Sequence, residues 1–221
     1  MFQKTHKGAV IRGSIGRWVV LLLAFVFFLS LWVFNNQSVL ATLFGNRVLA
    51  ENVEPPVSWR TLNSTKLGIS ILYPPNFVVD SSYVYTQLSP RAGINGVKFT
   101  IPESDAKGTN LSHFDTGVSV EVLPRETACI GTSFVEGSLA SDTLTERGVT
   151  YAVVKTAGAG VGNFYEETVY VIVGSVPCTA VRYFLHSTNI QNYEPGTIVA
   201  FNKPELLKEF DMIRRSLILT H

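Results

Sequence analysis

The sequence predicts an α+β domain, built on an antiparallel β-sheet flanked by helices and preceded by one N-terminal transmembrane helix. Three observations lead to this prediction. Residues 18–34 form an uncharged apolar run. At least seven segments beyond it show the two-residue alternation or the β-branched composition of strands. The last segment, residues 202–217, instead places its apolar residues at helical spacing.

Residues 18–34, WVVLLLAFVFFLSLWVF, are expected to cross a membrane as a signal anchor. A spanning helix needs roughly 17–25 apolar residues, and this run lies at the short end of that range. Four basic residues precede it, whereas the first acidic residue of the chain is Glu51. Because basic flanks stay in the cytoplasm, we expect residues 1–17 to be a cytoplasmic tail and the rest to lie outside.

A cleaved signal peptide is the alternative interpretation of the same segment. Ala41 and Ala50 each end a Val-Leu-Ala tripeptide, which has the small-residue form of a cleavage site. The apolar run is longer than the roughly 7–15 residues usual for a signal peptide, which favours the uncleaved anchor. Either way, residues 35–57 form a juxtamembrane segment and linker, and residues 58–221 form an extracytoplasmic domain.

The charge of the chain is divided unevenly between its two parts. The first fifty residues hold five of the eighteen basic residues and none of the seventeen acidic ones. The remainder therefore carries thirteen basic and seventeen acidic residues, a net charge of −4. A mildly acidic domain argues against nucleic acid as a partner, because phosphate binding needs clustered positive charge.

Cys129 and Cys178 are the two cysteines of the chain, and both belong to the exported part. In an oxidising compartment a pair of cysteines is more often bridged than free. The sequence therefore predicts a Cys129–Cys178 disulfide, against the alternative of two unrelated buried thiols.

The domain reads as a series of strands that ends in a helix. Residues 127–139 are ambiguous between a helical turn and a loop, and residues 157–162 are interpreted as a glycine-rich connection. A long loop is expected at 187–202. The strands are expected at residues 67–73, 77–85, 97–101, 118–122, on both sides of a hairpin turn at Arg147-Gly148, and at 169–173 and 179–186.

The closing helix has a clear start signal. Asn202 is a plausible N-cap, Pro204 falls in the first turn, and Glu205 sits three residues after the cap, as in a capping box. An apolar face follows at i, i+3/4, i+7 and i+11, which predicts that the helix lies across the sheet. That face is formed by Leu206, Leu207, Phe210, Ile213 and Leu217.

Both ends of the domain resemble a known family. Residues 67–74, LGISILYP, are similar to the opening of PsbP-like domains, which is a hydrophobic-Gly-hydrophobic-Ser strand that ends in Tyr-Pro and a Trp; Phe77 replaces that Trp here. Phe210, Ile213 and Ser216, followed by an apolar pair, resemble the closing helix and strand. The resemblance spans residues 59–221. It implies an α/β/α sandwich and a mostly non-catalytic, protein-binding role, often in exported or membrane-anchored bacterial proteins.

A sortase-like cysteine transpeptidase is the enzymatic alternative. His113, Cys178 and Arg182 occur in the order that such an anchored enzyme would use, with Arg182 steadying an oxyanion. Against it, Arg182 follows Cys178 on the same strand, and Cys129 is available to consume the thiol.

The expected function is therefore that of a non-catalytic binding or assembly module of the cell envelope, whose partner is an envelope protein or a surface polymer. The loop at 187–202 is the preferred binding surface, because long loops inside compact domains are often functional. Its candidate residues are Asn189, Asn192, Tyr193 and Phe201. No cofactor is expected, and His113 with Asp115 has no third metal ligand nearby.

Overall fold

The computed structural model describes residues 56, 58–88, 93–124, 128–136 and 140–220. Residues 1–55 lie outside the described residues, so the anchor at 18–34 and its cleaved alternative stay predictions. Across the part of the chain that is described, no helix combines the length and the apolar character needed to cross a membrane.

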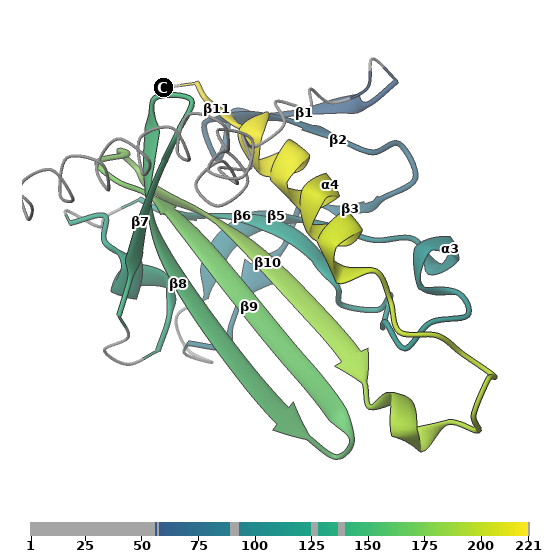
Figure 1. Cartoon of the computed structure of the whole chain (residues 1–221). Coiled ribbons are helices and arrows are strands. Elements are labelled where there is room, and N and C mark those ends of the chain that lie inside the picture. The colour runs from purple at the N-terminus through teal and green to yellow at the C-terminus, as the bar shows by residue number, and fades with distance from the viewer. Residues whose placement is uncertain (1–55, 57, 89–92, 125–127, 137–139, 221) are drawn as a thin grey trace, which may run out of the picture. The chain divides into compact units, whose positions relative to one another are not determined.

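The domain is organised around one large antiparallel sheet (Figure 1). Its strands are arranged in the order β3-β5-β6-β10-β9-β8-β7, and β4 pairs with β5 beside β3. The bounds are β3 Val78–Asp80, β4 Val84–Tyr85, β5 Ile94–Thr100, β6 Gly117–Leu123, β7 Asp142–Glu146, β8 Val149–Gly160, β9 Asn163–Ile172 and β10 Cys178–Thr188.

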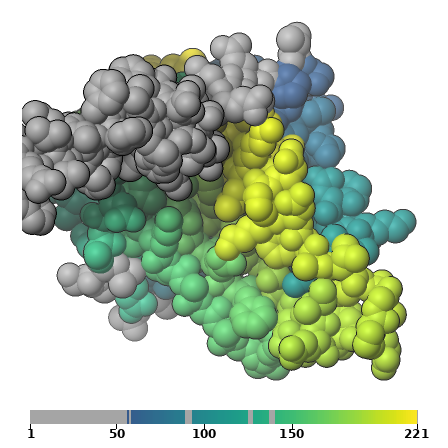
Figure 2. All heavy atoms as spheres, viewed as in Figure 1, coloured from purple at the N-terminus to yellow at the C-terminus, as the bar shows by residue number. Residues whose placement is uncertain are grey.

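A second, three-stranded sheet and the closing helix cover one face of the large sheet. The small sheet has the order β1-β2-β11, with bounds Arg60–Ser64, Ile69–Tyr73 and Ile218–Leu219, and the helix α4 spans Lys203–Arg215. Figure 2 shows this face, with α4 in yellow between the small sheet in blue and the hairpin β8–β9 in green. Ser216 joins helix to sheet, because its hydroxyl accepts from Leu72 N at 2.9 Å.

Alternation along the strands produces two cores, one on each face of the large sheet. Val118, Val120 and Tyr183 point toward α4 and pack with Phe210 and Ile213 of the helix. On the opposite face, Val154, Val169, Val171 and Ala180 pack under the short 3-10 helix η1, Gly131–Phe134.

The predicted antiparallel α+β domain is confirmed, but its helical cover is sparse. Among the described residues, α4 is the one α-helix longer than four residues; the others are α3, Glu103–Ala106, and the 3-10 helices η1 and η2, Ile190–Asn192. The face opposite α4 is covered by η1 and by the segment around β4. A full helical layer on both sides, as in an α/β/α sandwich, is not seen in the described parts of the chain.

Local expectations are partly confirmed. The Arg147-Gly148 turn is present, and both residues have positive φ, 50° and 80°, as a two-residue hairpin turn requires. Asn202 caps α4, because its side chain accepts from Glu205 N at 3.3 Å. The strand expected at 77–85 is interrupted where Asp80 accepts from Ser82 N at 2.9 Å and turns the chain.

The sequence suggests a connection at residues 157–162, but in the structure this segment is part of a β-hairpin. β8 continues to Gly160, and a second two-residue turn follows at Val161 and Gly162, with φ of 51° and 79°. β9 then begins at Asn163, so the two strands form one long hairpin (Figure 1). Residues 157–160 are alanine and glycine, and their backbones pair with β9 although their small side chains bury little surface. A search for alternating large apolar residues therefore does not detect this part of the strand.

Candidate functional site

A polar pocket lies on the face of the large sheet opposite α4. Its volume is about 200 Å³. Strands β5, β6, β9 and β10 supply its floor, and the segment 83–87 around β4 supplies one wall. We name it the Lys98 pocket, and its lining residues are Tyr83, Val84, Tyr85, Thr86, Gln87, Lys98, Asp115, Gly117, Ser119, Glu167, Arg182 and Phe184.

Arg182 forms the base of the Lys98 pocket. Its side chain is 1% exposed and lies against Glu121, which is fully buried. Nε donates to Glu121 Oε1 at 2.8 Å, and Nη2 donates to Glu121 Oε2 at 2.9 Å, which is a bidentate pair. Nη1 donates to Glu167 Oε2 at 2.5 Å. The strand register creates this cluster, since Arg182 lies opposite Ser119 on one side and Val169 on the other.

Further contacts hold the guanidinium of Arg182 in place. Nη2 also donates to the carbonyl of Phe134 at 2.7 Å, and the ring of Tyr85 stacks 3.7 Å from Cζ. Burial by itself lowers the pKa of Arg182, but hydrogen bonds and charges of Glu121 and Glu167 outweigh it and raise the pKa. Burial raises the pKa of Tyr85 to about 12. Arg182 and the two glutamates therefore form a fixed floor of the pocket, in which the charge of the arginine is paired.

Lys98 is the second cation of the pocket, and its environment differs. Its Nζ lies 5.7 Å from the ring centres of Tyr83 and Phe184, and no carboxylate of the described residues comes within ion-pair distance. Burial lowers the pKa of Lys98, and the charges of Asp115, Glu121, Asp80 and Glu167 offset only part of that effect. Its ammonium is thus partly desolvated and has no hydrogen-bonded counter-ion.

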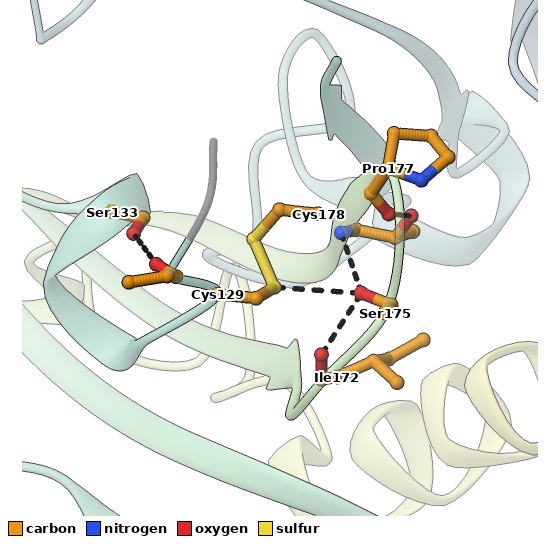
Figure 3. The surroundings of a disulfide bond; sticks show 8 residues. Cys129, Ser133, Ile172, Ser175, Pro177 and Cys178 are labelled. Atoms are coloured by element: carbon orange, nitrogen blue, oxygen red, sulfur yellow. Dashed lines mark hydrogen bonds between the residues drawn. A yellow bond between two sulfur atoms is a disulfide. The ribbon is translucent and has the colours of Figure 1, made fainter. Parts of the chain in front are cut away.

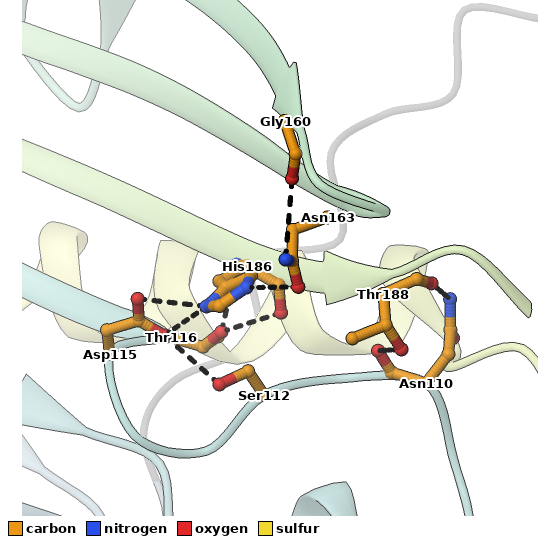
Figure 4. Close-up of polar contacts among 8 residues, drawn as sticks. All are labelled: Asn110, Ser112, Asp115, Thr116, Gly160, Asn163, His186 and Thr188. Atoms are coloured by element: carbon orange, nitrogen blue, oxygen red, sulfur yellow. Dashed lines mark hydrogen bonds and ion pairs between the residues drawn. The ribbon is translucent and has the colours of Figure 1, made fainter. Parts of the chain in front are cut away.

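A polar clamp holds the rim of the pocket (Figure 4). His186 Nδ1 lies 2.8 Å and 2.9 Å from the two carboxylate oxygens of Asp115, and His186 Nε2 lies 3.0 Å from Asn163 Oδ1. Asn163 Nδ2 donates to the carbonyls of Gly160 and Val161 at the hairpin turn. The clamp therefore ties Asp115 to β10 and to the tip of the β8–β9 hairpin.

The predicted disulfide is confirmed, and it secures the cover of the ion cluster (Figure 3). Cys129 and Cys178 are bonded, and no free cysteine remains. Ser175 lies beside the bridge: its hydroxyl donates to Ile172 O at 2.9 Å and accepts from Thr179 N at 2.9 Å. Because Cys129 precedes η1, the bridge tethers the segment whose Phe134 carbonyl contacts the buried arginine.

The structure does not bring together the three residues of the transpeptidase alternative. Cys178 begins β10 and is bonded to Cys129. His113 belongs to the opposite end of that strand, because its neighbour Ser112 donates its N–H to His186 O at 2.8 Å. Cys178 and His186 are eight positions apart along the strand, which is roughly 26 Å. Arg182, the third residue, is held by the two glutamates.

The four residues of the predicted binding loop make internal contacts. Asn189 accepts from Gln191 N at 3.0 Å, Asn192 Nδ2 donates to Gly162 O at 3.4 Å, and the Tyr193 hydroxyl lies 2.9 Å from Thr188 Oγ1. Phe201 packs against the core. Asn192 holds the loop against the hairpin tip, and none of the four residues lines the Lys98 pocket.

Sequence reasoning did not select Lys98, Glu121 and Glu167 as candidate site residues. A signal was available, because Lys98 and Glu121 are charged residues inside strands that are otherwise apolar or uncharged. Without the register, nothing in the pattern says that they share one face. No group of three or more candidate metal ligands occurs in the described ranges.

Comparisons with known proteins give a likeness in fold. No protein-family model and no curated protein matches the chain. A solution structure of cyanobacterial PsbP (CyanoP) from Synechocystis sp. PCC 6803 is 13% identical, with a TM-score of 0.41, over 75% of this chain and 94% of that one. A crystal structure from Bacteroides thetaiotaomicron VPI-5482 is 9% identical, with a TM-score of 0.40, over 74% of this chain.

This chain spans 49% of the Bacteroides chain. The resemblance to PsbP-like domains expected from both ends of the sequence thus recurs in the comparison of structures, where it concerns the fold alone.

Proposed function

We propose that this chain is a non-catalytic binding module of the cell envelope, displayed outside the membrane by an anchor at residues 18–34. In this proposal the Lys98 pocket receives one residue-sized group of a larger partner. The observation that carries the proposal is the pocket itself, a concave polar site with a desolvated cation on an otherwise fully paired floor.

The size of the pocket supports a macromolecular partner. Its volume of about 200 Å³ falls below the roughly 300–1,000 Å³ usual for small-molecule and cofactor sites. A single side chain or terminal group fits such a space, and the rest of the affinity would come from the surface around it. This favours recognition of one anchoring group, as at the centre of many interfaces.

Two further observations support a binding role over a catalytic one. Both cysteines of the chain are bonded to each other, which removes the nucleophile that the transpeptidase alternative requires. The Arg182 guanidinium is held by two glutamates and a carbonyl, so its charge is already paired with two carboxylates before any oxyanion could form. The disulfide also favours an oxidising compartment outside the cytoplasm.

Site-specific photo-crosslinking in intact membranes tests the proposal. A photoreactive amino acid at Val84, which lines the pocket and is 43% exposed, should capture a partner as a discrete adduct. The matched control places the same amino acid at Val78, which is 63% exposed on the same sheet edge but outside the pocket. Equal labelling from both positions, or none from either, would overturn the assignment of the pocket as the binding site.

A protease accessibility experiment tests the compartment separately. Protease added to sealed cells should degrade the domain at 58–221 without lysis. Protection that is lost only on lysis would contradict the extracytoplasmic placement.

A further inference from the structure

We infer that the group bound in the Lys98 pocket is a single carboxylate, presented by an acidic segment of a protein partner. This inference rests on the proposed function of the pocket and adds the chemical class of the group that it recognises.

The ion pairs around the pocket involve every charged lining residue except Lys98. Arg182 is held by two carboxylates, those of Glu121 and Glu167, and Asp115 is engaged by His186. Lys98 is the charged lining residue for which no ion pair exists within the described chain. An ammonium has three donors and no acceptor, so the partner that completes it must supply acceptor oxygens. A carboxylate supplies them and forms a charge-assisted hydrogen bond with the ammonium.

The acidic residues of the lining limit the charge of the ligand. Asp115 and Glu167 repel an anion in proportion to its charge, so a single carboxylate fits beside Lys98 better than a dianion such as a phosphate group. A cationic group fits less well, because it would meet Lys98 and would have to displace the bonds that already hold both carboxylates. Those bonds are His186 to Asp115 at 2.8 Å and Arg182 to Glu167 at 2.5 Å.

The walls of the pocket strengthen such a pair. Tyr83 and Phe184 each place the centre of an aromatic ring 5.7 Å from Nζ of Lys98. Rings exclude water and lower the local dielectric constant, in which an opposite charge is attracted more strongly than in water. Burial lowers the pKa of Lys98, and the negative charge of a bound anion would offset that effect, so binding and protonation of Lys98 are coupled.

The strand beside the pocket favours a peptide as the carrier of the carboxylate. β4 pairs with β5 on one side, and among the described strands it has no partner on its other side. Residues 84–87, which include this strand, line the pocket. An extended segment that pairs with a free strand edge places alternate side chains into adjacent pockets, which is a common mode of peptide recognition.

Saturation-transfer NMR on the full-length chain in lipid nanodiscs tests the inference. The probes are acetyl-Ala-Thr-Glu-Thr-Ala-amide, the same peptide with Gln in place of Glu, the Gln peptide with a free C-terminal carboxylate, and digalacturonate. The Glu peptide should bind at least about tenfold more tightly than the blocked Gln peptide, the value expected for a hydrogen bond to a charged group. Tighter binding of the free-terminus peptide would identify the C-terminus as the source of the carboxylate.

Variants connect the preference to the pocket. Lys98→Met should remove the preference for Glu over Gln, whereas Lys98→Arg should keep it. Lys155→Met is the matched control, because Lys155 is an exposed strand lysine outside the pocket, and this variant should keep the full preference. Near-UV circular dichroism of each variant shows whether the domain remains folded.

The outcomes separate the two proposals. Equal binding of the blocked Glu and Gln peptides, with crosslinking at Val84 intact, would overturn the carboxylate and leave the binding module standing. Binding of digalacturonate alone, dependent on Lys98, would overturn the protein partner. If no probe binds, the inference fails, and the crosslinking result decides the proposed function by itself.

Discussion

Replacing Arg182 by methionine should destabilise the domain severely, because it leaves two carboxylates without their cation. Glu121 is fully buried and keeps only the Ser119 hydroxyl, which donates to it at 2.8 Å. Removing one partner of a buried ion pair typically costs about 3–5 kcal/mol of unfolding free energy. Methionine fills most of the volume of the arginine stem, so the loss reports the stranded charge and not a cavity.

The double variant Arg182→Met/Glu121→Met isolates the cause. Apolar replacement of a whole buried ion pair is often neutral, so the double variant should recover about 2 kcal/mol or more of the loss. Glu167 remains, but it lines the pocket and can be hydrated. The surface pair of Lys203 and Glu166, 42% and 44% exposed, is the control; Lys203→Met should cost at most about 1 kcal/mol.

Urea unfolding of the full-length protein, followed by near-UV circular dichroism with the disulfide intact, measures these differences. The reasoning is refuted if Arg182→Met costs less than about 1 kcal/mol, since a stranded buried charge cannot be that cheap. It is also refuted if the double variant loses as much as the two single variants added together, because additive losses would mean that Arg182 and Glu121 do not interact.

Three further predictions concern parts of the fold outside the pocket. Replacing Cys129 and Cys178 by serine opens a loop with a sequence separation of 49 and should lower the unfolding free energy by about 4 kcal/mol in the chain-entropy estimate, measured by urea titration; a loss below about 1 kcal/mol would contradict it. Asn202→Ala removes the α4 cap and should cost about 1 kcal/mol, whereas Asn202→Asp should be nearly neutral in the same assay. Burial raises the pKa of Tyr85 and Tyr170 to about 12, above the unfolded value near 10, so the folded chain keeps protons that the unfolded chain releases. Stability should therefore be unaffected by these tyrosines below about pH 10 and fall as the pH rises toward about 12, and a constant urea midpoint over that window would contradict the burial.

The outline of the fold could be predicted because its signals are local. Alternation over residues 118–122 places valines on one face, and the structure extends that strand by one residue at each end as β6. The cap at Asn202 and the turn at Arg147-Gly148 depend on side chains and φ angles within a few residues. The two cysteines required only the inference of an oxidising compartment.

The pocket could not be predicted, because it depends on long-range register. Lys98 lies opposite Ser119, which lies opposite Arg182, which lies opposite Val169. These four residues come from four strands, and a shift of one residue in any pairing would turn a side chain to the other face. From sequence, a lysine or glutamate within a strand is expected to be solvated. Here the side chains of three neighbouring strands and of the β4 segment line a pocket together with Lys98.

The close approach of β5 and β6 is a second feature that only the register reveals. A Cβ on Gly117 would lie 2.1 Å from the carbonyl oxygen of Phe99, and a Cβ on Gly96 would lie 2.3 Å from that of Val120. Both glycines therefore let the two strands pair closely beneath the Lys98 pocket, where Gly117 is itself a lining residue. In the sequence these positions are indistinguishable from turn glycines.

Arg182 and Lys98, the two cations of the pocket, differ in their hydrogen bonds and therefore in their expected roles. Every nitrogen of the Arg182 guanidinium donates to Glu121, Glu167 or the Phe134 carbonyl, so Arg182 fixes the floor of the pocket. Among the described residues the Lys98 ammonium has no hydrogen-bonded partner, and it lies 5.7 Å from the ring centres of Tyr83 and Phe184. Changes at Arg182 should therefore act on binding only through stability, whereas changes at Lys98 should alter binding in a domain that remains folded.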